Sequence, residues 1–301
     1  TDGLKLGHEI NILDIFISVW KDKKIIIFIT FAFAVFSVFY ALSIANRYES
    51  SALLSISNNE ENSMMSSLSS SYGGLASLAG INLPNQNSGN KASLAIELLK
   101  SRSFVRHILE VNPDVKKNLM AAVDFNYSKE ELIYNEKIFD SKKNMWLIEE
   151  PTYLDVYEVY MSKVIGVYMD IETGYLTISV EHYSPLYAKD LLNTIIDELN
   201  SLVRKQDLLK STKSLNYLED KTRASGLVEV KSAFNKIIES QIKTQMLAEI
   251  DDEYLLKRID PPFTPEKKSY PRRAFLCIVI TFGGFLFAIF YSILRSFVFK
   301  R

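Results

Sequence analysis

Cysteine, histidine and net charge are all scarce in this chain. Its 301 residues include one cysteine and three histidines, and the formal net charge is −1. Because Cys277 has no second cysteine to pair with, no intrachain disulfide forms, and the fold must rest on its packed core or on partner subunits. The histidines (His8, His107 and His182) are too far apart in sequence to form a metal-spaced pair.

Motifs of catalysis and of nucleic-acid binding are also missing. No G-x-x-x-x-G-K-[ST] phosphate loop is present, and the serine run at 66–71 lacks a nucleophile-elbow pattern. The acidic run at 251–253 fits a solvated helix end better than a cation site. Residues 46–272 carry 27 Lys or Arg and 32 Asp or Glu, which excludes a basic face for nucleic acid. We therefore predict a protein that is not an enzyme and that needs no cofactor or metal.

Two long uncharged stretches stand out against this background. Ile25–Ala45 and Ala274–Leu294 each contain 21 residues without a charged side chain. As helices they would each span about 30 Å, the thickness of the hydrocarbon core of a bilayer. The first stretch is too long for a signal-peptide core, and no small-residue cleavage pattern follows it. We predict two transmembrane helices, at 25–45 and 274–294.

The flanking charges predict an orientation. Lys21, Lys23 and Lys24 precede the first span, which places the N-terminal arm (1–24) and the C-terminal tail (295–301) in the cytoplasm. The basic residues at 267–273 lie on the opposite side, but long domains cross a membrane largely regardless of their charge. Residues 46–273 are therefore expected outside the cytoplasm.

The segment between the spans predicts an α+β domain. Strands are expected at 47–56 and 254–259, with a β-hairpin at 165–183 turning at Thr173-Gly174. Helices are expected at 8–20, 91–111, 128–139 and 152–164. A long helical hairpin is expected at about 186–250, broken at 224–226. The Ser- and Asn-rich segment at 58–90 is either a disordered linker or a segment that docks through its leucines. We predict a small mixed sheet at the membrane, with the hairpin projecting from it.

A cluster of prolines and a pair of glycines are the candidate functional residues. Pro261, Pro262, Pro265 and Pro271 make residues 260–273 resist both helix and sheet, and they predict a stiff strap that fixes the angle of the second span. Gly283 and Gly284 lie inside that span, where missing side chains allow helices to approach closely. The alternative is a purely structural role, in which the prolines only end a strand and the glycines face lipid.

Several stretches of the chain resemble the Wzz family of polysaccharide co-polymerases, the chain-length determinants. GGLASLAGINL (73–83) looks like the family's Gly-Leu-Ala segment, and LLKSRSFVRHILE (98–110) is similar to its S-R-x-[LVF] helix. LTISVEHYSPLYAKDLLNTIIDEL (176–199) looks like its strand and Asp-Pro-x-x-Ala start of the long helix, with Ser184 in place of the usual Asp. The strap matches at Pro262, Pro265 and Pro271, with a longer gap before the last. Together these stretches cover nearly the whole chain.

The resemblance implies a bacterial inner-membrane protein whose periplasmic domain forms ring-like homo-oligomers. It would set the modal length of O-antigen or a related lipid-linked glycan made by a Wzy-type polymerase. Some relatives carry a cytoplasmic kinase domain, which is not expected here. Other interpretations remain open: a capsule-export co-polymerase working with an ABC transporter, a two-span periplasmic sensor, or an extracytoplasmic glycosyl hydrolase.

Overall fold

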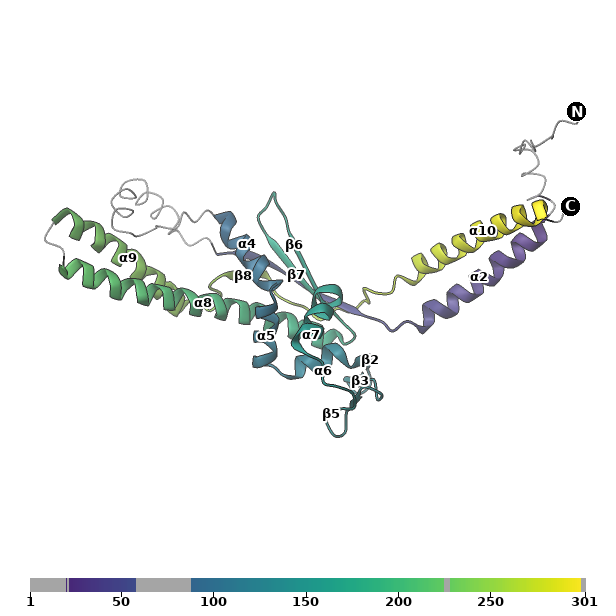
Figure 1. The fold of residues 1–301 in the computed structure, drawn as a ribbon, viewed down its shortest axis with the longest axis horizontal. Coiled ribbons are helices and arrows are strands. Elements are labelled where there is room, and N and C mark those ends of the chain that lie inside the picture. Colours follow the sequence, from purple (N-terminus) through teal and green to yellow (C-terminus); the bar gives the residue numbers. More distant parts are fainter. Residues whose placement is uncertain (1–19, 21, 58–87, 225–227, 299–301) are drawn as a thin grey trace, which may run out of the picture. The chain divides into compact units, whose positions relative to one another are not determined.

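The chain forms two compact units, each of which is described by itself. They comprise residues 1–46 with 268–301, and residues 47–267. The structure, a computed structural model, describes residues 20, 22–57, 88–224 and 228–298 (Figure 1). The predicted helix at 8–20 and most of the segment at 58–90 therefore lie outside the described residues.

The first unit is a pair of apolar helices that pack against each other, α2 (Lys23–Ser43) and α10 (Arg273–Val298). Both are long and apolar enough to cross a membrane, yet only 17% and 11% of their most apolar windows are buried. A core helix of a water-soluble protein would be mostly buried, so these exposed apolar surfaces suit lipid. The helices occupy the positions of the two predicted spans.

The second unit is built on a four-stranded sheet in the order β6–β7–β1–β8. Its strands are β1 (Tyr48–Ile56), β6 (Ile165–Met169), β7 (Leu176–His182) and β8 (Leu256–Asp260). β1 and β8 pair with each other beside the β6–β7 hairpin. All pairings among these strands are antiparallel, so the prediction of a mixed sheet was wrong. The reason is that β6 and β7 form a hairpin, while the chain enters the unit through β1 and leaves it through β8.

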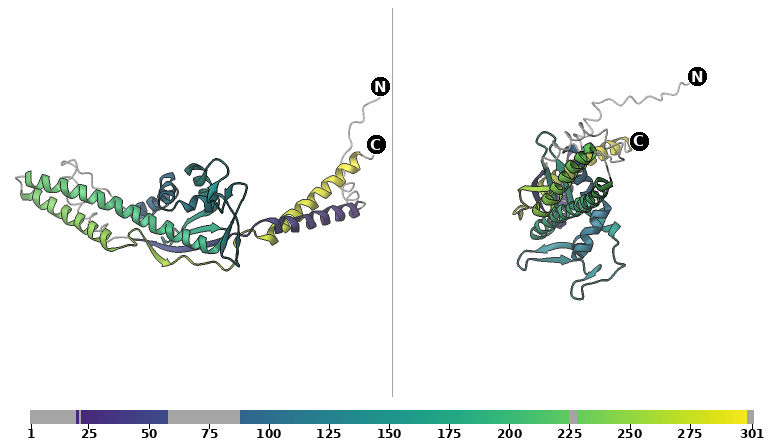
Figure 2. Two further views of the ribbon diagram at one scale, coloured as in Figure 1. Left: turned by 90° about the horizontal axis from the view of Figure 1, so that it is seen from below. Right: turned by 90° about the vertical axis from the view of Figure 1, so that its left-hand side faces the viewer.

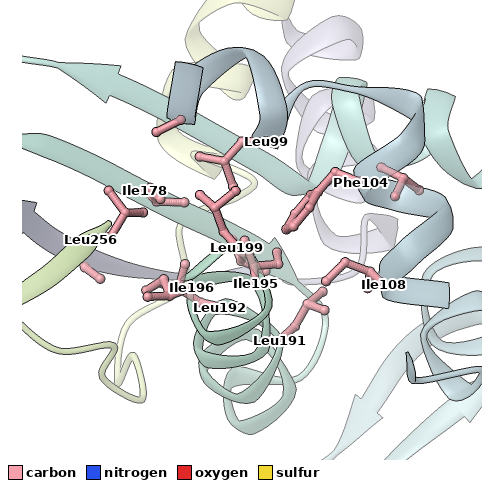
Figure 3. Packing of buried hydrophobic residues seen from close by; sticks show 14 of the residues in the cluster. Leu99, Phe104, Ile108, Ile178, Leu191, Leu192, Ile195, Ile196, Leu199 and Leu256 are labelled. Carbon is pink, nitrogen blue, oxygen red and sulfur yellow. The ribbon is translucent and has the colours of Figure 1, made fainter. Parts of the chain in front are cut away.

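The core lies between this sheet and the first half of the 40-residue helix α8 (Pro185–Ala224). Alternate residues of β7 are fully buried, as the two-residue period of a strand requires. On α8 the buried side chains recur at helical spacing: Leu191, Leu192, Ile195, Ile196 and Leu199. Figure 3 shows Ile195 and Leu199 between Ile178 of the sheet and Phe104 of a covering helix.

Four short helices complete the cover of this core: α4 (Ser88–Leu99), α5 (Arg102–Val111), α6 (Asp114–Met120) and α7 (Tyr153–Val159). The single helix predicted at 91–111 is in fact α4 followed by α5. The break occurs because the side chain of Ser101 accepts a hydrogen bond from the backbone N–H of Phe104 at 3.1 Å and so starts a new helix. The helix predicted at 152–164 is confirmed as α7 with a π-helical turn, Tyr160–Val164, at its end.

The helix predicted at 128–139 was wrong. This region forms two small hairpins, β2 (Ala122–Asn126) with β3 (Glu131–Tyr134), and β4 (Phe139–Asp140) with β5 (Met145–Trp146). The side chain of Asn126 accepts hydrogen bonds from the backbone N–H groups of Ser128 and Lys129 at 3.0 and 3.3 Å. That turn uses Ser128 in a hairpin and leaves it unable to cap a helix.

The long helical hairpin is confirmed. α8 and α9 (Val228–Ile250) lie side by side, and their outer parts extend beyond the sheet (Figure 2). A small separate cluster of Leu218, Phe234 and Ile237 joins the two helices there. The predicted break at 224–226 begins where α8 ends, and residues 225–227 lie outside the described residues.

Candidate functional site

The proline-rich strap follows directly on β8. Residues 261–269 form neither helix nor strand, as expected where prolines remove backbone donors. Pro262 and Pro265 are buried in the second unit, whereas Pro261 is exposed. Pro271, also buried and preceded by a cis peptide bond, belongs to the first unit. The extended conformation was predicted; that the strap crosses the boundary between the units was not.

Ser50 of β1 holds the strap against the sheet. Its side chain is fully buried and donates a hydrogen bond to the backbone carbonyl of Phe263 at 2.6 Å. Phe263 lies between two of the buried prolines, so this bond fixes a backbone that cannot complete a sheet ladder. The two residues are 213 positions apart. No sequence pattern pointed to Ser50, because the bond depends on the strap running beside β1.

The two glycines of α10 have different surroundings. A Cβ placed on Gly284 would lie 2.5 Å from the Cβ of Phe33 on α2, whereas one placed on Gly283 would meet nothing within 4 Å. Ala288 and Ser292 follow Gly284 on the same face of α10, each one turn further along, and both are fully buried. Small residues on one face let two membrane helices approach closely. Gly284 therefore lies at the α2–α10 contact, whereas a Cβ on Gly283 would not reach α2.

Polar contacts hold both ends of the helix pair. At one end Ser292 donates to the carboxylate of Asp22 at 3.2 Å. At the other end Asn46 accepts from Lys268 at 3.4 Å and from Arg273 at 3.2 Å. Lys268 and Arg273 belong to the basic group whose position opposed the predicted orientation. Their bonds to Asn46 give these charges a local structural role.

Asn200 is a further residue that no pattern pointed to. It lies on the buried face of α8, where a polar side chain is costly unless it is fully hydrogen-bonded. Its carbonyl accepts from the backbone N–H groups of Leu255 and Leu256 at 2.9 and 2.8 Å, and its amide donates to the carbonyl of Leu256 at 3.0 Å. Asn200 thus fixes the start of β8 to the long helix.

The acidic run at 251–253 is engaged in ion pairs. Asp251 pairs with Lys257 at 3.2 Å, Asp252 with Arg204 at 2.9 Å, and Glu253 with Arg258 at 2.7 Å. The pairs with Lys257 and Arg258 join this run to β8, and the pair with Arg204 joins it to α8. Within the described part of the chain, no three His, Cys, Asp or Glu residues are grouped to hold a metal ion.

The histidines have structural roles where they are described. His182 is buried, its Nε2 faces the backbone carbonyl of Asn118 at 3.0 Å, and its Nδ1 accepts from the N–H of Ser184 at 3.2 Å. Burial lowers the pKa of His182 to about 4, so the ring is neutral and satisfied on both sides. His107 of α5 pairs with Glu198 of α8 at 2.8 Å. His8 lies outside the described residues.

The N-terminal third of the chain is similar to a known protein family. Residues 8–110 match the family model Wzz, described as chain length determinant protein. The resemblance to the Wzz family is confirmed. The match includes the first apolar helix, β1 and the helices α4 and α5, together with the Gly-Leu-Ala segment and the S-R-x-[LVF] stretch noted above.

Solved structures give a weaker likeness to the same proteins. A "full-length bacterial polysaccharide co-polymerase" covers 96% of this chain and 99% of its own, with a TM-score of 0.40 and 10% identity. A fragment of WzzB, a polysaccharide co-polymerase from Salmonella Typhimurium, covers 75% of this chain and 100% of its own, with a TM-score of 0.26 and 12% identity. No curated protein sequence matches the chain. The likeness to the Wzz family therefore rests on the family model, which covers residues 8–110.

Proposed function

We propose that this chain sets the modal length of a lipid-linked surface polysaccharide, O-antigen or a similar glycan, acting with a Wzy-type polymerase. The observation that carries the proposal is the Wzz match over residues 8–110, which includes one apolar helix and the first strand of the sheet. A chain that enters this sheet from one apolar helix and leaves it for another supports the same role.

The proposed location is the bacterial inner membrane, with both termini in the cytoplasm and the 47–267 unit in the periplasm. The lysines before α2 support this orientation. A cysteine at Ser214, which is exposed on α8, should react with a membrane-impermeant maleimide in cells whose outer membrane alone is permeabilised, in a Cys277→Ser background. Ser211 is the matched control, because it is 1% exposed and its hydroxyl donates to the carbonyl of Gln241 at 2.8 Å. Labelling at Ser214 only after the inner membrane is opened would reverse the proposed topology.

The protein is proposed to regulate the polymerase and to have no catalytic activity of its own. The support is the engagement of its candidate acid and histidine residues in ion pairs and core hydrogen bonds. Purified protein should neither hydrolyse ATP nor extend or cleave glycan without the polymerase. Activity that a point substitution in this chain abolishes would contradict the proposal.

A ring-like homo-oligomer is proposed because the helical hairpin leaves apolar side chains uncovered. Leu209, Ile242, Met246 and Ile250 are between 44% and 77% exposed on α8 and α9. A hairpin of two helices has little core of its own, and the outer cluster of three buried residues is small. Contacts with neighbouring copies would cover this surface.

The test of the function is the profile of surface polysaccharide with and without the gene, restored by a plasmid copy. Loss of the modal length with polymer retained is the expected result. Loss of polymer export at unchanged length would favour the capsule-export alternative. An unchanged profile at normal expression of the polymerase would refute the proposal.

A further inference from the structure

A cleft of about 450 Å³ lies on the second unit, and neither the strap nor the helical hairpin contributes a residue to its lining. Its walls are the end of α5 and the start of α6 on one side, and the β4–β5 hairpin and the start of α7 on the other. Figure 1 shows α5, α6, α7 and β5 at the same end of this unit. The volume is within the range of small-molecule sites, about 300–1,000 Å³. The proposed function assigns nothing to this cleft.

Three aromatic rings line the cleft, those of Phe139, Trp146 and Tyr153. Trp146 is half-buried, and its ring meets that of the buried Phe139 in an edge-on contact at 5.1 Å, across a cross-strand pair. Phe139 in turn contacts Tyr134, so the Trp146 ring has a rigid support. Tyr153, the first residue of α7, is 40% exposed, and the Arg106 guanidinium lies 5.8 Å from its ring centre. The cleft thus offers two held aromatic surfaces.

The charged groups of the cleft come in pairs of opposite charge. Arg106 pairs with Glu110 at 3.1 Å, Lys117 with Asp114 at 2.8 Å, and Lys116 with Glu150 at 2.6 Å. The last pair joins α6 to the segment after β5. Three cations and three carboxylates leave no net charge around the cleft. Ion pairs exposed to this degree contribute at most about 1 kcal/mol, so a ligand can replace one at little cost.

This combination identifies the ligand chemistry. A balanced set of charges gives no attraction for an anion such as phosphate, and six charged groups make a poor site for a lipid tail. Neighbouring hydroxyls, by contrast, donate to carboxylates and accept from ammonium or guanidinium groups. The C–H face of a sugar ring is apolar and packs against an aromatic ring with burial of apolar area. Aromatic surfaces with paired donors and acceptors therefore suit a neutral sugar.

We propose that this cleft binds a short, uncharged segment of glycan, with Trp146 and Tyr153 packing on sugar rings and the charged pairs binding hydroxyls. The inference rests on the proposed function in one respect, since the glycan would be the polysaccharide whose length the protein sets. It adds a place on the chain where growing polymer is held. Holding polymer outside the polymerase gives a regulator a direct contact with what it measures.

The chain contains two tryptophans, which makes a direct binding test possible. With Trp20→Phe in the full-length protein in detergent, Trp146 is the sole tryptophan and reports on the cleft. The probe is water-soluble polysaccharide released by mild acid from the parent strain. A saturable change in Trp146 emission is expected, and Tyr153→Ala should weaken binding about tenfold. Tyr168→Ala is the matched control, because Tyr168 is 68% exposed on β6 and does not line the cleft.

Each outcome supports or overturns the proposal. No saturable change, or equal binding by the Tyr153→Ala variant, would overturn it. An equal response to inorganic phosphate would make the cleft an anion site and would also overturn it. Trp146→Ala removes the cross-strand contact with Phe139 in the β4–β5 hairpin, so the conclusion rests on Tyr153→Ala.

Failure of the proposed binding site can be distinguished from failure of the proposed function. If deleting the gene leaves polysaccharide length unchanged while Trp146 still responds to the probe, the function fails and the binding site stands. If deletion alters length but neither Trp146 emission nor the Tyr153→Ala length profile changes, the binding site fails and the function stands.

Discussion

Gly284→Leu is the substitution that tests the packing of α10 against α2 most directly. A Cβ at this position would lie 2.5 Å from the Cβ of Phe33, where carbon atoms normally approach to about 3.5–4 Å. α10 must therefore move away from α2 by roughly 1 Å before the rest of the leucine is accommodated. Overpacking of this kind costs about 1–3 kcal/mol, which weakens the helix contact about 5- to 150-fold.

Gly283→Leu is a matched control, because it makes the same chemical change where a Cβ meets nothing within 4 Å. Both changes replace glycine in a helix and raise helix propensity equally. A difference between the two variants therefore reports the contact with Phe33 alone.

Cross-linking measures that contact. Ser292 and Asp22 are hydrogen-bonded at 3.2 Å, so cysteines at these two positions, in a Cys277→Ser background, should be joined by a short bifunctional thiol reagent. Gly284→Leu should lower the yield in membranes and shift the polysaccharide length profile, and Gly283→Leu should leave the yield unchanged. Equal yields in the two variants would refute the packing role of Gly284. A changed length profile with Gly283→Leu at full cross-linking would instead indicate a partner outside this chain.

Three further predictions concern the second unit and the strap. Asn200→Ala should lower unfolding free energy by about 3–5 kcal/mol, because it leaves buried backbone groups of Leu255 and Leu256 without partners; urea unfolding in detergent measures this, with the half-exposed Asn193→Ala as control. Burial gives His182 a pKa of about 4 in the folded protein, against 6.5 for the unfolded chain. Its contribution to the unfolding free energy is therefore complete above pH 6.5, and about 3 kcal/mol is lost as the pH falls to 4. His182→Gln should remove this part of the pH dependence of the unfolding free energy, and an unchanged pH dependence would contradict the prediction. Replacing Pro262, Pro265 and Pro271 by Ala should broaden the length distribution at normal protein levels, since the strap loses its restricted backbone; an unchanged gel profile would favour prolines that merely end a strand.

The elements that sequence predicted well are those with a local signal. Long runs of uncharged residues identify α2 and α10, and a dense stripe of apolar residues identifies the first half of α8. The β6–β7 hairpin follows from alternation around Gly174, which has a φ of 73° that most other residues would adopt only with strain. The pairing of β1 with β8 needed only the argument that both lie next to the apolar helices in sequence.

The elements that sequence missed depend on distant partners or on competing local bonds. Ser128 and Glu131 fit a capping box, yet residues 131–134 pair with β2, and Glu130 takes a φ of 54° to make the turn. The periodicity of 91–111 continues through Ser101, whose side chain nevertheless begins a new helix.

The candidate site shows the same limit. Gly283 and Gly284 are equivalent in sequence, and only the position of Phe33 on another helix separates them. Ser50 and Asn200 are ordinary polar residues until the strap and β8 are placed beside them. Sequence identified the segments that matter, whereas the residues that fix them required the fold.

The helical hairpin is linked to the strap by a short segment of chain with several fixed points. α9 ends at Ile250, β8 begins at Leu256, and the strap begins at Pro261, so few residues separate the hairpin from the prolines. Each step is held to the rest of the unit: ion pairs hold 251–253, Asn200 holds the start of β8, and Ser50 holds the strap at Phe263. A shift of α9 cannot be absorbed by a slack loop along this path, because the described chain from 250 to 263 is bonded at each of these points. Pro265 restricts the backbone further just after the bond at Phe263. Along this path we expect a contact on the hairpin to affect the backbone as far as the hydrogen bond between Ser50 and Phe263.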